Sequence, residues 1–170
     1  MSIKFNVIAP DFVWGKNSRI GEFCHIYPKV KIGDDVIIKS YVELRDGTVI
    51  GNNCYIDSGV KMSGNCKIGN NVTIRYDSII ARGVEIGDGS FIAPQFMTEN
   101  LDANRKEIGG AKVGKNVFIG TNVTLASGIT ICDGAIIGTK ANVRKDITVV
   151  GVYIGSPAKL VIQQKSPIKK

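Results

Sequence analysis

The stretch IGEFCHIYPKVKIGDDVIIKSYVELRDGTVI, residues 20–50, places a large aliphatic side chain at every sixth position. Two residues before each of these lies a small or β-branched residue in nearly every case, such as Cys24, Val30 and Val36. A helix with 3.6 residues per turn would scatter such a row around all of its sides, whereas short strands joined by regular corners keep it on one side. The sequence therefore predicts a stack of short strands. The row runs through Ile20, Ile26, Ile32, Ile38, Leu44, Ile50, Ile56, Met62, Ile68, Ile74, Ile80, Ile86 and Ile92.

Glycine often follows the large aliphatic residue, as at Gly21, Gly33 and Gly51, which suits a tight corner with an unusual backbone conformation. This repeating unit resembles the hexapeptide-repeat family of left-handed parallel β-helices. The resemblance implies an all-β chain in which three hexads form one triangular coil, and assembly as a homotrimer. We expect six to seven coils in a domain spanning residues 1–160, with one extended loop, and a short basic C-terminal extension at residues 161–170.

The six-residue period is broken once, between Ile92 and Val113, which are 21 residues apart (113 − 92 = 21) instead of 18 or 24. We therefore expect Thr98–Lys112, TENLDANRKEIGGAK, to leave the coil as an extruded loop. Long loops on rigid scaffolds commonly carry binding or catalytic residues, although a tolerated surface insertion is the alternative. The row resumes after the loop as Val113, Ile119, Leu125, Ile131, Ile137, Val143 and Val149.

The segments FIAPQFMTEN (residues 91–100) and VGKNVFIGTNVTLASGITICDGAIIGTKANV (residues 113–143) resemble bacterial N-acetyltransferases that act on nucleotide-linked amino sugars. The resemblance implies transfer of an acetyl group from acetyl-CoA to the amine of such a sugar. It also makes Thr98, Asn100 and Arg105 the expected acceptor contacts. The loop lacks the Pro that precedes an Arg in several members, so the identity of the sugar is not carried over.

The chain contains one histidine, His25, which lies 73 residues or about four coils before Thr98. At about 4.8 Å per coil that separation is close to 20 Å, whereas a general base must lie within about 3 Å of the proton it removes. We therefore expect a surface role for His25 and an amine acceptor, because an amine can lose its proton to water, to the substrate or to a carboxylate. Glu99, Asp102 and Asp77 are the candidate carboxylates.

Backbone N–H groups at corners after the loop, those of Gly120, Ala126 and Gly138, are candidates for stabilising an oxyanion beside the thioester. The segment GVYIGSPAKLV, residues 151–161, resembles the end of many hexapeptide acyltransferases, with Ser156 in place of the usual Asn. The resemblance implies that CoA lies along the C-terminal coils. The cations expected to meet its phosphates are Lys140, Arg144, Lys145 and Lys159.

The formal charge of +7 is spread along the chain without a basic run interleaved with aromatic residues, which argues against nucleic acid as a partner. Residues 1–14 lack the pattern of a secretion signal, and no apolar run approaches the roughly 18 residues of a membrane span. We expect a cytoplasmic protein without stable membrane insertion.

Three of the four cysteines, Cys24, Cys54 and Cys66, occupy the small inward position of the repeat, where they are expected to be packing residues. Cys132 falls at a corner, no CxxC pair occurs, and no metal is predicted. Two alternatives to the N-acetyltransferase hypothesis stay open. One is an O-acetyltransferase of a saccharide hydroxyl, and the other is a β-helix scaffold without enzymatic activity.

Overall fold

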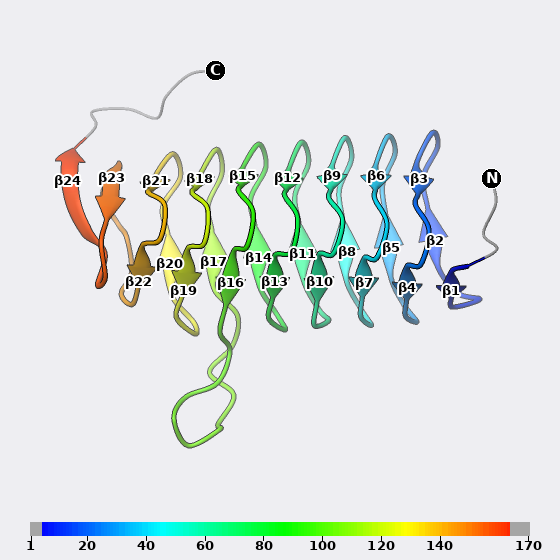
Figure 1. Cartoon of the computed structure of the whole chain (residues 1–170), viewed down its shortest axis with the longest axis horizontal. Helices are drawn as coiled ribbons and strands as arrows, with labels where there is room; N and C mark the ends of the chain where they lie inside the picture. The colour runs from blue at the N-terminus through cyan, green and yellow to red at the C-terminus, as the bar shows by residue number, and fades with distance from the viewer. Residues whose placement is uncertain (1–4, 164–170) are drawn as a thin grey trace.

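A computed structural model describes residues 5–163, which form a three-sided prism of stacked coils without a helix (Figure 1). Most strands are two residues long, four-residue corners separate them, and each strand pairs in parallel with the strand three places further along the chain. The predicted all-β parallel β-helix is thus confirmed. It has about eight coils, because one of its three sheets contains eight strands.

The three sides of the prism are sheets A, B and C. Sheet A contains β1 (Val7–Ile8), β4 (His25–Ile26), β7 (Glu43–Leu44), β10 (Lys61–Met62), β13 (Ile79–Ile80), β16 (Met97–Thr98), β19 (Thr124–Leu125) and β22 (Asn142–Val143). Sheet B contains β2 (Val13–Trp14), β5 (Lys31–Ile32), β8 (Val49–Ile50), β11 (Lys67–Ile68), β14 (Glu85–Ile86), β17 (Lys112–Val113) and β20 (Thr130–Ile131). Sheet C contains β3 (Arg19–Ile20), β6 (Ile37–Ile38), β9 (Tyr55–Ile56), β12 (Thr73–Ile74), β15 (Phe91–Ile92), β18 (Phe118–Ile119), β21 (Ile136–Ile137), β23 (Gly151–Ile154) and β24 (Lys159–Gln163).

The coil count exceeds the six to seven expected, since the prism begins before the regular row of aliphatic residues. Its first strands are β1 and β2, where the inward positions hold Ile8 and Trp14. Ile8 is only partly buried and Trp14 is 42% exposed, so neither belongs to the buried core. The row of aliphatic residues shows where the buried core begins, and the first two strands precede that row.

The core consists of the two inward rows that the spacing predicts. The large aliphatic residues from Ile26 to Ile92 are almost completely buried, and so are Cys24, Cys54 and Cys66 in the second row. The thiol of Cys54 donates to the carbonyl of Gly69 at 3.1 Å, and burial raises the pKa of the Cys54 thiol. These cysteines are therefore protonated packing groups at neutral pH.

The glycines that follow the aliphatic residues are required for a reason other than the one the sequence suggested. Gly51 does not have a positive φ; instead a Cβ on it would lie 2.6 Å from Oδ1 of Asn70 in the next coil. That oxygen accepts a hydrogen bond from the Asn52 N–H at 2.8 Å. Close approach of neighbouring coils, and not backbone angle, excludes a side chain at Gly51. The left-handed conformation occurs two residues later, at Asn53.

The repeat loses its register a second time near the C-terminus, which the sequence analysis did not anticipate. Val149, expected to point inward, is 39% exposed, whereas Ile147 is buried and bridges to Ile131. The step from Ile131 to Ile147 is 16 residues, so the coil is two residues short. Tyr153 on β23 then takes the position beside Ile137.

The end of the prism is closed by β24, which pairs antiparallel with β23. This strand runs from Lys159 to Gln163 and so extends beyond the expected domain limit at residue 160. Residues 164–170 of the expected tail lie outside the described residues.

The two residues of β13 provide a matched test of the inward and outward rows. Ile80 is fully buried and Ile79 is 39% exposed. We expect Ile80→Ala to lower the free energy of unfolding by about 2–5 kcal/mol, because it leaves a cavity. Ile79→Ala should change it by about 0.5 kcal/mol. Urea unfolding followed by circular dichroism measures both, and equal losses would contradict the assignment of the core face.

Candidate functional site

The loop leaves the prism at the corner between sheets A and B, where Figure 1 shows one long excursion below the stack. It is shorter at both ends than expected, because Thr98 belongs to β16 and Lys112 to β17. Residues 99–111 therefore form the projecting segment. Thr98 continues the six-residue row (92 + 6 = 98) and pairs with Leu125 in the next coil.

Thr98 has a structural role at the base of the loop. It is 6% exposed, and its Oγ1 accepts a hydrogen bond from the Ala81 N–H at 2.7 Å. One coil earlier the equivalent N–H, that of Ser63, donates to the main-chain carbonyl of Ile80. The Thr98 hydroxyl thus replaces a backbone acceptor where the chain turns outward. The hydroxyl of Thr98 therefore stabilises the base of the loop, and its predicted contact with the acceptor stays a prediction.

The loop folds back on itself as a short hairpin. Leu101 and Glu107 form an antiparallel bridge across it. Within the turn, Oδ1 of Asp102 accepts hydrogen bonds from the backbone N–H groups of Asn104 at 2.8 Å and Lys106 at 2.9 Å. The carboxylate of Asp102 therefore holds the turn together.

Two hydrogen bonds fasten the hairpin to the next corner of the prism. The Ser127 hydroxyl donates to the Leu101 carbonyl at 2.9 Å, and the Gly128 N–H donates to the Gly109 carbonyl at 3.0 Å. The hairpin consequently lies toward the C-terminal coils. The sequence analysis missed Ser127, whose position just after Ala126 at the corner below the loop could have identified it.

A cavity of about 550 Å³ lies between the hairpin and the two following corners. It brings together four of the residues predicted from sequence, namely Glu99, Asp102, Ala126 and Arg144. Glu99 has no hydrogen-bond or ion-pair partner for its carboxylate within residues 5–163. The complete lining is Glu99, Leu101, Asp102, Ala103, Ile108, Ala126, Ser127 and Arg144.

A second cavity of about 250 Å³ adjoins the same edge of the prism at its C-terminal end. Three of the four predicted phosphate-binding cations line it: Arg144, Lys145 and Lys159. Arg144 lines both cavities. The arrangement places three cationic side chains next to the space under the loop.

The remaining predicted residues lie elsewhere. Asp77, Gly120, Gly138 and Lys140 all occupy corners between sheets C and A, on a different edge from the loop. Asn100 and Arg105 belong to the loop but do not line the cavity beneath it. In the single chain, these residues do not join the cluster around Glu99.

The predicted oxyanion donors are already used by the fold. The N–H groups of Gly120, Ala126 and Gly138 donate to the carbonyls of Ile137, Val143 and Tyr153 at 2.8, 2.9 and 2.8 Å. An N–H that takes part in the coil-to-coil ladder cannot also stabilise an oxyanion, so this expectation is corrected. Ser127 lines the cavity, and its backbone N–H has no acceptor within the described part of the chain.

His25 lies where the sequence placed it. It is exposed on β4, four strands of sheet A before β16, which corresponds to about 19 Å. Its ring stacks on Tyr27 with the centroids 4.1 Å apart. The prediction that His25 is remote from the loop is confirmed.

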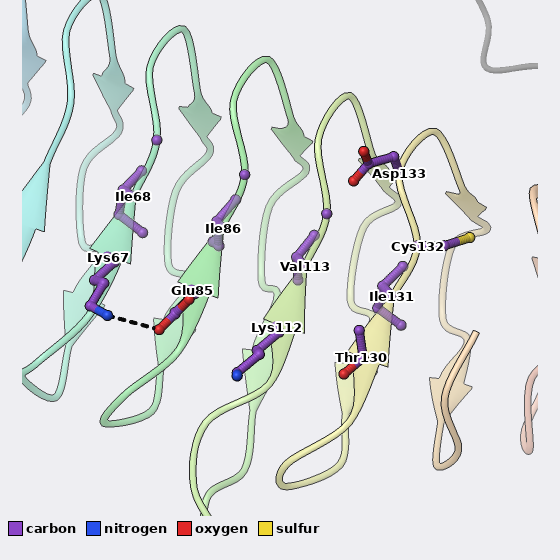
Figure 2. A pocket seen from close by; sticks show the side chains of 13 residues that line it. Lys67, Ile68, Glu85, Ile86, Lys112, Val113, Thr130, Ile131, Cys132 and Asp133 are labelled. Carbon is purple, nitrogen blue, oxygen red and sulfur yellow. Dashed lines mark hydrogen bonds and ion pairs between the residues drawn. The ribbon is translucent and has the colours of Figure 1, made fainter. Parts of the chain in front are cut away.

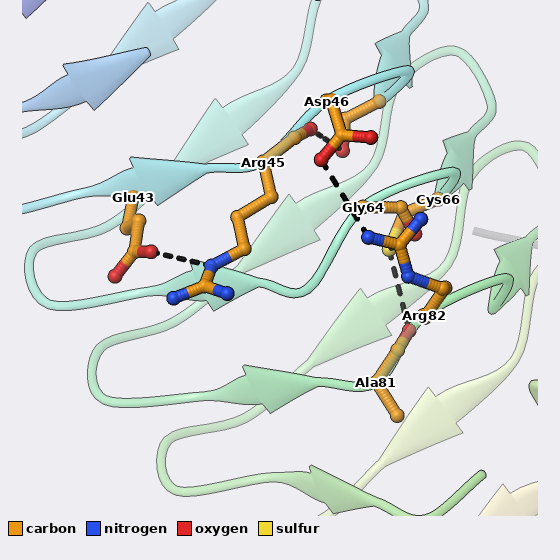
Figure 3. A network of polar contacts seen from close by, with 8 residues as sticks. Glu43, Arg45, Asp46, Gly64, Cys66, Ala81 and Arg82 are labelled. Carbon is orange, nitrogen blue, oxygen red and sulfur yellow. Dashed lines mark hydrogen bonds and ion pairs between the residues drawn. The ribbon is translucent and has the colours of Figure 1, made fainter. Parts of the chain in front are cut away.

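Two corners on the edge between sheets A and B, before the loop in the chain, carry the charged residues Asp46 and Arg82 (Figure 3). Arg82 reaches across Gly64 to Asp46, with Nη2 and Oδ1 3.5 Å apart. A Cβ on Gly64 would lie 3.0 Å from the same Nη2. The sequence analysis did not single out Arg82.

The outer face of sheet B is a shallow, open hollow of about 430 Å³ (Figure 2). Lys67 and Glu85 form an ion pair across it at 3.0 Å, and Lys112 lies beside them at the base of the loop. Within residues 5–163, no three His, Cys, Asp or Glu side chains are grouped so as to hold a metal ion. That part of the chain also has no helix long and apolar enough to cross a membrane.

Comparison with known proteins gives a family match. The model described as bacterial transferase hexapeptide (six repeats) matches residues 15–46, 47–82 and 110–145, which is more than half of the chain. Its matched segments omit residues 83–109, which include the loop. No curated protein matches the sequence closely enough to count as a relative.

Many solved structures resemble the prism. A maltose O-acetyltransferase from Clostridium difficile 630 is 27% identical, with a TM-score of 0.59 and 71% of each chain covered. A UDP-N-acetylglucosamine acyltransferase from Francisella novicida is 21% identical, with a TM-score of 0.68, covering 84% of this chain and 55% of that one. The corresponding enzyme from Campylobacter jejuni is 18% identical, with a TM-score of 0.59 and coverage of 94% and 73%.

The hydrogen bond at the base of the loop can be tested with two substitutions of Thr98. Thr98→Val keeps the shape but leaves the Ala81 N–H without an acceptor, which costs about 1–3 kcal/mol. We expect amide exchange in the peptides containing Ala81 and the loop to accelerate roughly 5- to 150-fold. Thr98→Ser keeps the hydroxyl and should exchange nearly as slowly as the unaltered chain. Equal acceleration in both variants would show that the hydroxyl does not anchor the loop.

Proposed function

We propose that this chain, which belongs to the bacterial hexapeptide transferase family, moves an acetyl group from acetyl-CoA to the amine of a nucleotide-linked amino sugar. Acyl transfer to a sugar is supported by the 27% identity to a maltose O-acetyltransferase over 71% of both chains. The likeness to the UDP-N-acetylglucosamine acyltransferases supports the fold alone, since their identities are 21% and 18%.

The observation that carries the proposal is the composition of the cavity under the loop. It contains the carboxylate of Glu99 and the guanidinium of Arg144, and it contains no imidazole. A sugar hydroxyl needs a strong general base before it can attack a thioester, whereas an amine needs only to be deprotonated. A site with a carboxylate as its base therefore favours the amine.

We assign the role of proton acceptor to Glu99. Both Glu99 and Asp102 line the cavity, but Oδ1 of Asp102 is occupied by two backbone N–H donors. Protonating Asp102 would weaken the hydrogen bonds that hold the turn of the hairpin. Glu99 can accept a proton without that loss. Asp77 lies on another edge of the prism and has no part in this assignment.

In the proposed reaction the amine nitrogen attacks the thioester carbonyl, and its surplus proton passes to the Glu99 carboxylate. The C–N bond forms and the C–S bond breaks, and the proton held by Glu99 passes to the CoA sulfur, so that CoA leaves as a thiol and the Glu99 carboxylate is restored. The developing negative charge on the carbonyl oxygen needs a donor placed in advance. Ser127 lines the cavity and its backbone N–H has no acceptor in the described chain, so we propose this N–H as the donor.

The cofactor side of the site is proposed from the C-terminal cavity. Arg144, Lys145 and Lys159 line it, and guanidinium and ammonium groups bind phosphate oxygens through charge-assisted hydrogen bonds. Arg144 lies between the two cavities and would hold acetyl-CoA with its thioester toward the loop. Such alignment of two substrates supplies much of the rate of a bimolecular transfer. We further propose a cytoplasmic homotrimer.

A second candidate function is O-acetylation of a sugar hydroxyl. The likeness to a maltose O-acetyltransferase favours it. The absence of an imidazole near the loop in residues 5–163 is the observation against it. The two functions differ in the nucleophile, so one assay separates them.

Release of free thiol from acetyl-CoA measures the reaction directly. We expect turnover with nucleotide-linked amino sugars and little or none with the corresponding hydroxyl sugars or with maltose. Turnover with maltose and none with any amine would favour the O-acetyltransferase. No thiol release with either class of acceptor would remove both enzymatic proposals.

The role of Glu99 is tested by Glu99→Gln, which keeps the size of the side chain and removes the base. We expect kcat/KM to fall roughly 100- to 10,000-fold, the usual contribution of a general base. Most of the change should be in kcat. Glu85→Gln on the outer face of sheet B is the matched control, and His25→Ala tests the remote histidine; both should stay within a few fold of the unaltered enzyme. A large loss in His25→Ala would move the site to the N-terminal coils.

A further inference from the structure

Arg82 lies on the same edge of the prism as the loop, and the proposed reaction does not use it. It is the second residue of the corner between β13 and β14, the last corner between sheets A and B before the loop. Glu99 lies one coil beyond Ala81, the first residue of that corner (99 − 81 = 18), which corresponds to about 4.8 Å along the axis. Arg82 therefore borders the candidate site on its N-terminal side.

The loop leaves the guanidinium of Arg82 accessible. Its hairpin is fastened to Ser127 and Gly128, so it lies toward the C-terminal coils and away from this corner. The side chain of Arg82 is 37% exposed. Ala81, which is next to it and one coil before Glu99, has only a methyl side chain. At the corner itself, no bulky side chain separates the guanidinium from Glu99.

The fold engages the guanidinium of Arg82 only weakly. Its one polar partner within the described residues is Asp46, two coils earlier, with Nη2 and Oδ1 3.5 Å apart (Figure 3). Charge-assisted hydrogen bonds from nitrogen to oxygen are usually about 2.7–2.9 Å long, and exposed ion pairs contribute little stability. Gly64 lies between the two residues and has no side chain, which leaves room for the guanidinium. Most N–H donors of Arg82 are therefore available to an anion.

The proposed reaction brings together two phosphorylated substrates, whose phosphates repel each other. In that proposal acetyl-CoA is bound by Arg144, Lys145 and Lys159, on the C-terminal side of Glu99. In a sugar linked to a nucleoside diphosphate, the diphosphate is attached directly to the sugar ring, so it lies close to the acceptor amine. A position on the N-terminal side of Glu99 keeps the two sets of phosphates apart. Arg82 is the only cationic residue of the corner on that side.

We propose that Arg82 binds the diphosphate of the acceptor, which is a sugar linked to a nucleoside diphosphate and approaches Glu99 from the side opposite to acetyl-CoA. This role deepens the proposed function and rests on it. A guanidinium donates two parallel hydrogen bonds to phosphate oxygens. The diphosphate displaces Asp46 from Arg82, because two exposed and loosely paired charges separate at little cost. Arg82 is a binding residue and takes no part in the proton transfer.

Arg82→Gln removes the charge and keeps a polar side chain. With a nucleotide-linked amino sugar as acceptor, we expect KM to rise roughly 10- to 150-fold, the usual contribution of a hydrogen bond to a charged group, with little change in kcat. The KM for acetyl-CoA should stay the same. The amino sugar without its nucleotide should react equally slowly with the variant and with the unaltered enzyme. Arg19→Gln, which removes an exposed cation from sheet C, is the matched control and should keep both KM values.

Asp46→Asn separates binding of the substrate from a structural role of the ion pair. It abolishes the same ion pair and keeps the guanidinium, so the KM for the nucleotide-linked sugar should stay the same or fall. An equal rise of this KM in Asp46→Asn and Arg82→Gln would show that the ion pair matters and that Arg82 does not bind the acceptor. An unchanged KM in Arg82→Gln would also overturn the proposal.

Calorimetry separates a failure of this role from a failure of the proposed enzyme. UDP, GDP and dTDP are titrated in turn into the full chain with CoA in excess, so that the cofactor side is occupied. At least one should bind the unaltered chain, and should bind Arg82→Gln roughly 10- to 150-fold more weakly. This result would support the role of Arg82 even if no amino sugar released thiol, which would count against the enzyme alone. Binding of none of the three, or equal binding to both proteins, would overturn the role of Arg82 and leave acyl transfer unaffected.

Discussion

The structure depends on hydrogen bonding between the backbones of successive coils. Tyr55 donates its N–H to the carbonyl of Val72 at 2.9 Å, and Asp57 donates to Ile74 at 2.8 Å, and this pattern repeats along the chain. A strand of two residues has too little side-chain surface to be stable alone, so each coil is held by its neighbours. The inward aliphatic side chains of each coil likewise depend on those of the neighbouring coils for their packing. Any insertion must therefore leave the coil at a corner and return in register.

The two breaks in register show how the fold accommodates such departures. At the loop, the Thr98 hydroxyl accepts the N–H of Ala81 in place of a carbonyl. At the shortened last coil, Oδ1 of Asp146 accepts the N–H of Thr130 at 2.8 Å. Both breaks occur on the edge between sheets A and B, and the two cavities lie there. The candidate site thus lies where a side-chain oxygen, and not a backbone carbonyl, accepts the hydrogen bond between coils.

Much of the fold followed from the sequence, because the six-residue period reports directly which residues face inward. The period also located the loop and placed His25 far from it. It could not show the ends of the prism, since Trp14 and Val149 meet solvent there. It misjudged the corner glycines as well, because their requirement comes from Asn and Asp side chains one coil away, such as Asn70 beside Gly51.

The candidate site was predictable only in part. Glu99 and Arg144 were found because the loop and the C-terminal coils could be recognised. The sequence analysis did not assign each corner to an edge of the prism, and so it grouped Gly138 and Lys140 with residues on another edge. Thr98 falls on the six-residue row after Ile92, and the sequence analysis nevertheless assigned it to the loop.

The antiparallel strand β24 also determines how far the stack can grow. A coil that follows β23 in the same direction would offer its free edge to the next chain, and end-to-end addition could continue into a fibre. A strand that runs backwards does not present the parallel spacing that a further coil requires. The parallel stack of this chain therefore ends at a strand of opposite direction.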